Sequence, residues 1–214
     1  WGIPTIYLQC WPDRFIHTNA DTAAKIDPTK LKRAGFIAAA SALALANATA
    51  ADGAEIAGVI EQAALRRAAE TLAQSRDLSP SEASNRGRWQ LAYEAQMFAS
   101  MNRFFTPPPE VRSEAAEFST SLRSLFHTPV PAAESSGPVY RRNPGIRGSL
   151  DAFGYDYLED HLGRDRAVKL ALLTFEGSRG EGGDYTYEAR NLVNGPCTTS
   201  EIPDAMWAIY GPVP

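Results

Sequence analysis

The sequence has little cysteine and no long hydrophobic run, and each of these absences excludes a class of protein. Only two cysteines occur in 214 residues, Cys10 and Cys197, and they lie far apart without metal-like spacing. A disulfide framework and a cysteine-rich zinc module are therefore excluded. No apolar stretch reaches the length that a membrane span requires, so the sequence predicts no membrane span.

An excess of positive charge is also lacking. The formal net charge is -4, which argues against a protein that coats nucleic acid or an anionic membrane. Hydrophobic residues make up 44% and charged residues 21%, close to ordinary globular usage. We therefore expect a folded chain with a core and no nucleic-acid partner.

The first fifty residues predict one strand, a loop and a long helix. The run Ile3–Leu8 is apolar and rich in β-branched and aromatic residues, as in a buried strand. Asp27 before Pro28 combines an N-cap acid with proline at the first helical position, which predicts a helix to about Thr49. This order is typical of the end of a layered α/β sheet. Because the chain opens at Trp1 inside the strand pattern, we expect a fragment of a longer polypeptide.

After Gly53 the sequence predicts mainly helices. Apolar residues recur at helical spacing over Glu55–Arg76, and Ser79-Pro80 starts a third helix. Five large side chains recur every four residues on that third helix and predict a core seam: Trp89, Tyr93, Met97, Met101 and Phe105. Prolines 107–109 end it, and a shorter helix is expected over Glu110–Phe126.

The remaining sequence predicts a connection and a small terminal unit. Residues 128–149 are rich in proline, glycine and serine, as in a linker. The unit after it should begin with a helix over Leu150–Leu162, a helix or strand over Val168–Phe175 and a flexible loop over Gly177–Gly183. Two more helices are expected, one over Tyr185–Val193 and a final one through Ile202–Ile209. The final helix should start at a capping box over Thr198–Glu201. The final helix has no Arg or Lys, which argues against the reading of DNA bases.

The strongest candidate for chemistry is the loop after the first strand. His17 lies in the stretch Phe15–Thr22, and Asp21 follows four residues later. Proteins with α/β sheets bind ligands in loops at the carboxyl ends of strands. A metal-bound histidine usually has a carboxylate partner, which Asp21 could supply. From the residues alone the other interpretation, a satisfied loop histidine, is the commoner one for so short a motif.

A resemblance bears on this choice. Gly2-Ile3-Pro4 at the strand, His17-Thr18-x-x-Asp21-Thr22, and Ile26-Asp27-Pro28 before a long helix are similar to the end of the di-zinc aminopeptidase family. That family includes bacterial leucyl aminopeptidases and glutamate carboxypeptidase-like enzymes. The resemblance implies that His17 is the last metal ligand and binds one of two zinc ions. It assigns no role to Asp21, whose support of the metal-bound imidazole is our own inference.

The resemblance also implies a fold. We expect a mainly α chain: the last strand and helix of an α/β/α zinc-peptidase sheet, a helical extension, and a small winged-helix-like end. The expected boundaries are residues 1–52 for the end of the catalytic domain, 53–127 for the helical region, 128–149 for the linker and 150–214 for the terminal module.

The expected function is that of the C-terminal part of a zinc-dependent exopeptidase acting on peptides. The family's other ligands and its glutamate base precede this stretch in chain order. Zinc hydrolases need at least three protein ligands and an open position for water. We therefore expect no catalytic residue on this chain and no activity from it alone. Secretion or a periplasmic location is usual for the family.

The alternative is a non-catalytic helical module that binds a protein or peptide, with His17 in a structural role. Tyr187–Gly195 followed by Thr198–Ile202 resembles winged-helix-type binding modules, so a protein partner is expected at this end. The other histidines add little: His127 lies in the linker, and His161 after Glu159-Asp160 is typical of a solvated helix end.

Overall fold

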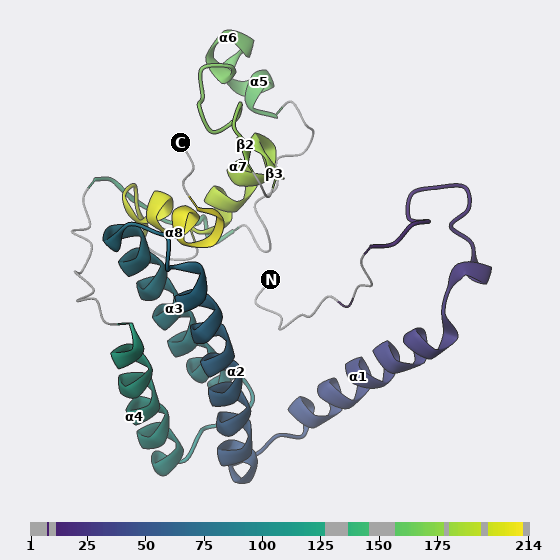
Figure 1. The fold of residues 1–214 in the computed structure, drawn as a ribbon, viewed down its shortest axis with the longest axis vertical. Coiled ribbons are helices and arrows are strands. Elements are labelled where there is room, and N and C mark those ends of the chain that lie inside the picture. Colours follow the sequence, from purple (N-terminus) through teal and green to yellow (C-terminus); the bar gives the residue numbers. More distant parts are fainter. Residues whose placement is uncertain are drawn as a thin grey trace.

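The computed structural model describes residues 8, 12–126, 137–145, 157–177, 180–193 and 197–211. These residues are mainly helical, which confirms the expected fold class at that level (Figure 1). The expected strand over Ile3–Leu8 lies outside the described residues except for Leu8. The helices and strands in chain order are η1 (Ala23–Lys25), α1 (Pro28–Ala46), η2 (Ala50–Asp52), α2 (Gly53–Gln74), α3 (Pro80–Ser100), η3 (Met101–Arg103), α4 (Pro109–Leu125), β1 (Val139–Tyr140), α5 (Tyr157–Leu162), α6 (Arg164–Ala167), β2 (Glu176–Gly177), β3 (Gly180–Glu181), α7 (Gly182–Asn191), β4 (Cys197–Thr198) and α8 (Glu201–Tyr210).

Helix α1 extends away from the other helices (Figure 1). Its start is fixed as predicted: an Asp27 carboxylate oxygen accepts hydrogen bonds from the backbone N–H groups of Thr29 and Lys30, at 2.8 and 3.3 Å, and Pro28 takes the first helical position. At the other end the Asn47 side chain donates to the Leu43 carbonyl. No residue of α1 is buried.

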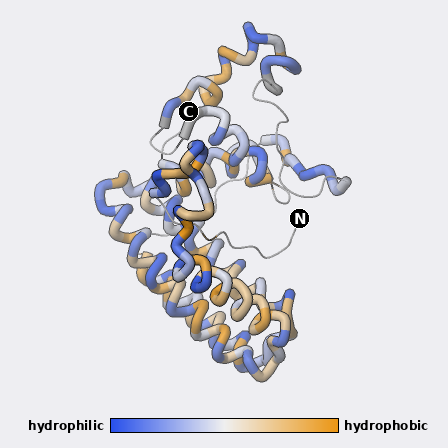
Figure 2. Tube along the Cα trace, turned by 90° about the vertical axis from the view of Figure 1, so that its right-hand side faces the viewer, coloured by the Kyte–Doolittle hydropathy of each residue, from blue (hydrophilic) through white to orange (hydrophobic). Residues whose placement is uncertain are grey.

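The helices α2, α3 and α4 pack together and hold most of the described core. Hydrophobic and hydrophilic residues alternate along these helices, as on amphipathic helices with one buried face (Figure 2). The buried residues of α2 include Ala57, Ala64 and Ala68, and small side chains of this kind take up little room between packed helices. The buried side chains form two clusters, one of Ala57, Ile60, Phe98, Met101, Val111 and Ala115, the other of Ala64, Ala68, Leu122 and Phe126.

A charged pair crosses the interface between α2 and α3. The Arg67 guanidinium donates two parallel hydrogen bonds to the Glu94 carboxylate, at 2.8 and 2.7 Å. Gln90 donates to the same carboxylate and accepts a hydrogen bond from the Thr71 hydroxyl. The Glu94 side chain is only 2% exposed. The bidentate geometry and the added amide satisfy a buried charge that would otherwise be costly.

The C-terminal elements form a second small core. Tyr185 on α7 and Met206 on α8 are buried there, and the Tyr185 ring makes edge contacts with Phe175 and Tyr210. Strands β1 and β4 pair antiparallel, with Val139 opposite Thr198. The domain boundaries stay a prediction.

Helix α8 joins this unit to the bundle of α2, α3 and α4. It packs against α3. There the Asn85 side chain donates to the Asp204 carbonyl at 2.7 Å, and Arg88 forms an ion pair with the Asp204 carboxylate at 3.1 Å.

The predicted seam on α3 is only partly right. Met101 is buried, and Met97 and Phe105 pack against the same cluster, but Tyr93 is 48% exposed. A spacing of four residues exceeds one helical turn of 3.6, so such a stripe drifts around the helix. The buried side of α3 instead follows Gly87, Glu94 and Phe98.

Three predictions for the C-terminal part are wrong in detail. Val168–Phe175 is neither helix nor strand but a series of turns. The loop expected over Gly177–Gly183 instead contains the ends of the β2–β3 hairpin, and α7 already begins at Gly182. Gly182 fits there because an added Cβ would lie 2.1 Å from the Leu173 carbonyl oxygen. The linker contains β1, whose two residues are too few to show a pattern in sequence.

Candidate functional site

The loop that carries His17 is held by short-range hydrogen bonds to Asp13 and Thr18. An Asp13 carboxylate oxygen accepts from the backbone N–H groups of Phe15 and Ile16 at 2.9 and 3.3 Å. The Thr18 hydroxyl donates to the Phe15 carbonyl at 2.6 Å and accepts from the backbone N–H of Ala20 at 3.2 Å. Asp and Thr side chains stabilise turns in this way. The loop therefore has a defined backbone although its residues are largely exposed.

His17 lies at the centre of this turn. Its φ is +63°, and among the described residues it alone has a positive φ without being glycine. That region is sparsely populated by side-chain-bearing residues, and such conformations gather at functional sites. The His17 side chain is exposed, so its ring nitrogens are accessible to a ligand from outside the loop.

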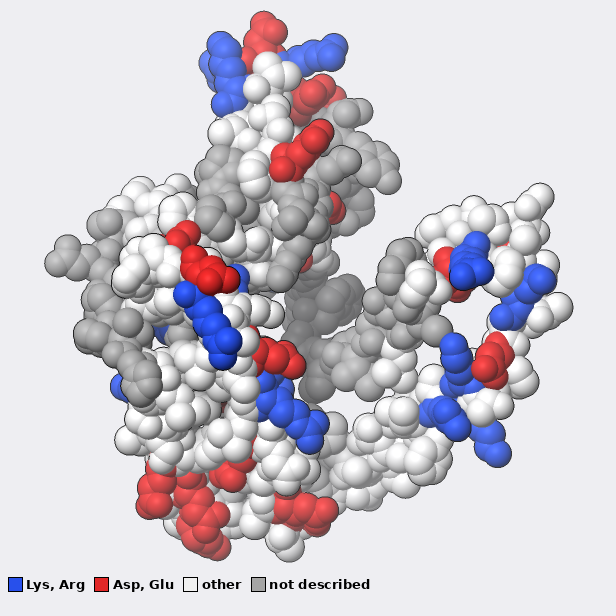
Figure 3. Space-filling view, in the orientation of Figure 1, with Lys and Arg blue, Asp and Glu red and all other residues white. Residues whose placement is uncertain are grey.

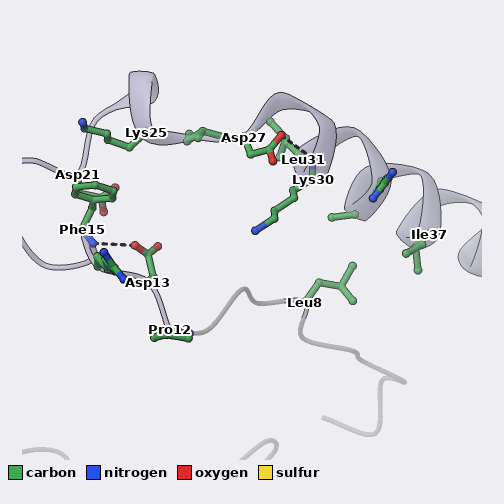
Figure 4. Close-up of a pocket in the computed structure, with 14 residues that line it drawn as sticks. Leu8, Pro12, Asp13, Phe15, Asp21, Lys25, Asp27, Lys30, Leu31 and Ile37 are labelled. Carbon is green, nitrogen blue, oxygen red and sulfur yellow. Dashed lines mark hydrogen bonds between the residues drawn. The ribbon is translucent and has the colours of Figure 1, made fainter.

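Asp21 is also exposed, and its backbone N–H donates to the Thr18 carbonyl at 3.1 Å. Within the described loop, no hydrogen bond joins Asp21 to His17. Asp21 instead lines a hollow between the loop and the start of α1 (Figure 4). Its support of a metal-bound His17 stays a prediction.

The hollow is open and has a volume of about 850 Å³. In Figure 4 the loop lies on one side and α1 on the other, with the Lys30 side chain reaching between them. Its apolar lining includes Phe15, Leu31 and Ile37. The Lys25 ammonium group lies 4.9 Å from the centre of the Phe15 ring. The hollow and the exposed side of α1 are thus continuous.

Helix α1 is apolar around most of its circumference. Phe36 is 72% exposed and Leu43 67%, and Leu31 and Ile37 are also exposed. No charged residue occurs from Ala34 to Ala51. In Figure 3 the later part of α1 is an uncharged bridge between the charged loop and the bundle. A helix that is hydrophobic all round is normally buried.

The described residues near the loop do not assemble a complete set of zinc ligands. Nowhere in the described ranges do three His, Cys, Asp or Glu side chains gather to hold a metal. His17 fits a single imidazole ligand, but zinc sites need three or four. His161 is exposed on α5, at a helix end as the sequence suggests, and His127 lies outside the described residues. Zinc binding by His17 would therefore need ligands from elsewhere.

Sequence reasoning missed the ion pair between Arg67 and the buried Glu94. No local signal could have found it, because the two residues are 27 positions apart and each resembles a solvated helix charge. The ion pair between Arg88 and Asp204 was missed for the same reason, because these two residues are 116 positions apart.

No single helix in the described residues is long and apolar enough to cross a membrane, in agreement with the sequence. Helix α1 and the segment Ala50–Gln74 reach the required length and hydropathy only as a pair bent by 117°.

Comparisons with models of known protein families, with curated proteins and with solved structures give no match to this chain.

Proposed function

We propose that this chain is the C-terminal part of a zinc-dependent exopeptidase of the aminopeptidase type, with His17 as one zinc ligand. The observation that supports it most is the presentation of His17. Its imidazole is exposed on a hydrogen-bonded turn with a positive φ, shortly before a helix whose apolar surface is bare. A backbone conformation that costs about 1–3 kcal/mol is retained where the surroundings or the function require it.

The chain's own contribution to catalysis is to hold one imidazole in place. A neutral His17 would donate a nitrogen lone pair to the metal. The hydrogen bonds that Asp13 and Thr18 make within the turn would limit the movement of the backbone that carries the imidazole. Zinc in such a site lowers the pKa of a bound water for attack on a peptide carbonyl. Because one ligand cannot hold the ion tightly, we expect the chain alone to hydrolyse no peptide.

The finer fold belongs to the same proposal. The segment Ile3–Leu8 and α1 would be the last strand and helix of an α/β/α sheet, and the C-terminal elements would form a winged-helix-like module. The packing of α7 on α8, together with the pairing of β1 with β4, supports the second part. A partner protein at that end remains part of the proposal.

The test is His17→Asn in the full-length gene product, the polypeptide encoded by the complete gene. Asn tolerates a positive φ, so the turn should persist while the imidazole is lost. We expect the zinc content to fall from two ions toward one by elemental analysis. Release of a chromophore from an aminoacyl substrate should fall by more than about 100-fold, since loss of even an outer hydrogen-bond partner of a metal ligand costs 10–100-fold.

The matched control is His161→Asn, an exposed histidine on α5, which should keep both zinc content and activity. Full zinc occupancy in His17→Asn would contradict the proposal. A full-length product that binds no zinc would favour the alternative, a helical module for protein or peptide binding.

A further inference from the structure

Helix α1 has two sides with different surroundings. One side contributes Leu31, Ala34 and Ile37 to the lining of the hollow, and Leu8 lines the same hollow from outside the helix (Figure 4). At about 3.6 residues per turn, these three positions of α1 lie on the same side of it. In the proposed function the sheet would cover this side, because Leu8 ends its last strand.

The opposite side of α1 carries the two most exposed large apolar side chains of the helix. Phe36 is 72% exposed and Leu43 is 67% exposed. They are seven residues apart, which is nearly two full turns, so they form one row along the helix. Neither lines the hollow, and nothing in the described part of the chain buries them. Burial of a side chain of this size is favourable by about 1.5–3 kcal/mol.

A membrane surface does not suit this row. A helix that lies on a membrane has one apolar side and one strongly polar side. In α1 the side opposite Phe36 and Leu43 carries Leu31 and Ile37 instead of polar residues. A protein partner therefore fits the row better than a lipid surface does.

The spacing of the row indicates what that partner is. Lys32 and Asn47 extend the row at its two ends, each four residues from the nearer apolar side chain. The row therefore has the same spacing when it is read from either end. When two identical helices pair antiparallel about a two-fold axis, Phe36 of each copy lies against Leu43 of the other. Residues 39–40 between them are alanines, which take up little room.

The charges at the two ends of α1 complement each other in this arrangement. The start of the row is cationic at Lys32, and α1 ends where the first turns of α2 and α4 lie side by side, since a Cβ added to Gly53 would be 3.3 Å from Pro108. Two arginines lie near these turns, Arg103 and Arg112, but exposed carboxylates outnumber them. We call these carboxylates the acidic foot of the bundle: Asp52, Glu55, Glu110 and Glu114 (Figure 3).

We propose that two copies of this chain pair antiparallel through the row of Phe36 and Leu43, so that the cationic start of each α1 lies beside the acidic foot of the other copy. In an antiparallel pair the start of one helix lies next to the end of the other, and α1 ends beside the foot. Because α1 extends away from its own bundle, the two bundles lie at opposite ends of the pair (Figure 1). The pairing needs no zinc and leaves the side with Leu31 to the proposed sheet.

The first experiment is sedimentation equilibrium of the 214-residue chain across a range of protein concentrations. One helix pair is a small interface, so we expect a dissociation constant of about 100 μM, and measurements from about 5 to 500 μM cover it. The mass should rise from that of one chain toward that of two. At low micromolar concentration the row of α1 is uncovered.

The second experiment removes one apolar side chain of the row with Leu43→Gln. The dissociation constant should rise at least about tenfold, because two-fold symmetry removes a buried leucine from both copies. The control is Leu65→Gln, the same change at a residue 48% exposed on α2 and about 18 Å from the start of that helix. It should leave the dissociation constant unchanged. Both variants should keep the unfolding temperature of the dilute monomer, which shows that they fold.

The third experiment tests the contact between the helix start and the foot. Glu55 is the acid to change, because the Asp52 carboxylate accepts hydrogen bonds from Thr49. Lys32→Glu and Glu55→Lys each place like charges against one another at both ends of the pair and should weaken association. An equal mixture of the two variants should associate again, because in the mixed pair a Glu faces a Lys at both contacts. Added salt should weaken the original dimer.

Three outcomes would overturn the proposal: the mass of one chain at every concentration, equal weakening by Leu43→Gln and Leu65→Gln, and a mixture of the charge variants that associates no better than either alone. Binding to vesicles of phosphatidylcholine and phosphatidylserine without self-association would also overturn it and assign the row to a membrane. None of these measurements depends on zinc, so their outcome is separate from that of the exopeptidase proposal.

Discussion

Glu94 places a carboxylate inside the bundle of α2, α3 and α4, where only Arg67, Gln90 and their hydrogen bonds offset the loss of water. The hydrogen bond to Glu94, the largest cause, raises the pKa of Arg67 above its ordinary value. An arginine guanidinium is charged throughout the ordinary pH range in any case. The two charges therefore stabilise the fold only as a pair.

We expect Arg67→Ala to lower the free energy of unfolding by about 3 kcal/mol, because it leaves the Glu94 carboxylate buried without its cation. Urea unfolding of the isolated chain measures this.

The adjacent Arg66, which is exposed, provides the control: Arg66→Ala should change the free energy of unfolding by less than about 0.5 kcal/mol. Replacing both partners with methionine should recover most of the loss, since an apolar pair needs no compensation. A loss in Arg67→Ala no larger than in Arg66→Ala would show that water reaches Glu94.

At this scale the sequence predicts the candidate residue but not its environment. His17 could be singled out because the motif around it is local. Its positive φ could not, since this depends on how the bonds of Asp13 and Thr18 close the turn. The burial of Glu94 depends on the register between two helices, which no short motif contains.

Among the elements, α3 has the most complete start. Ser79 and Glu82 form a capping box, in which the Glu82 carboxylate accepts from the hydroxyl and the backbone N–H of Ser79. The Ser79 hydroxyl and then its backbone N–H lower the pKa of Glu82 below its ordinary value of 4.5. The bonds of Thr49 and of Thr198 likewise lower the pKa values of Asp52 and Glu201.

A carboxylate whose folded-state pKa is lowered stabilises the fold fully above its unfolded value and loses that effect as the pH falls through the folded value. We therefore expect the unfolding temperature to fall as the pH drops below 4.5, the ordinary value for Glu82. Glu82→Gln should make this fall shallower, as measured by thermal unfolding across the acidic range. Glu117 is an exposed carboxylate outside any capping box, so Glu117→Gln should leave the dependence of the unfolding temperature on pH unchanged. If Glu82→Gln and Glu117→Gln gave the same dependence, the capping box would not be its cause.

Helix starts were the most predictable elements. Asp27-Pro28 and Ser79-Pro80 begin α1 and α3 as expected, because capping depends on neighbouring residues. The pairing of β1 with β4 was not predictable, since Val139 and Thr198 are far apart in sequence and each strand has two residues. The turns over Val168–Phe175 show that a short apolar run alone does not decide between helix and strand.

For the whole molecule, the described helices differ in whether they contribute to a hydrophobic core. Helices α2 to α4 share two core clusters, whereas α1 buries no residue. In the isolated chain we expect the amides of α1 to exchange with solvent at least about 100-fold faster than those of α2, because local opening of α1 exposes nothing new.

Hydrogen exchange with mass spectrometry measures this difference. The proposed function, in which α1 is the last helix of an α/β/α sheet, predicts that in the full-length product its amides exchange as slowly as those of α2. Equal protection of the two helices in the isolated chain would mean that α1 is already covered there.

The junction between α1 and α2 turns by 117° within a few residues, and there the backbone N–H and the hydroxyl of Thr49 both donate hydrogen bonds to the Asp52 carboxylate. If α2 is rigid, a small rotation at that turn is amplified along its length. Its 22 residues span roughly 33 Å, so a rotation of about 10° at Thr49 moves the far end by about 6 Å. With α1 held in place, the two hydrogen bonds from Thr49 to the Asp52 carboxylate would set the direction of the bundle and the C-terminal unit relative to α1. Loss of these bonds would let both rotate together about the turn.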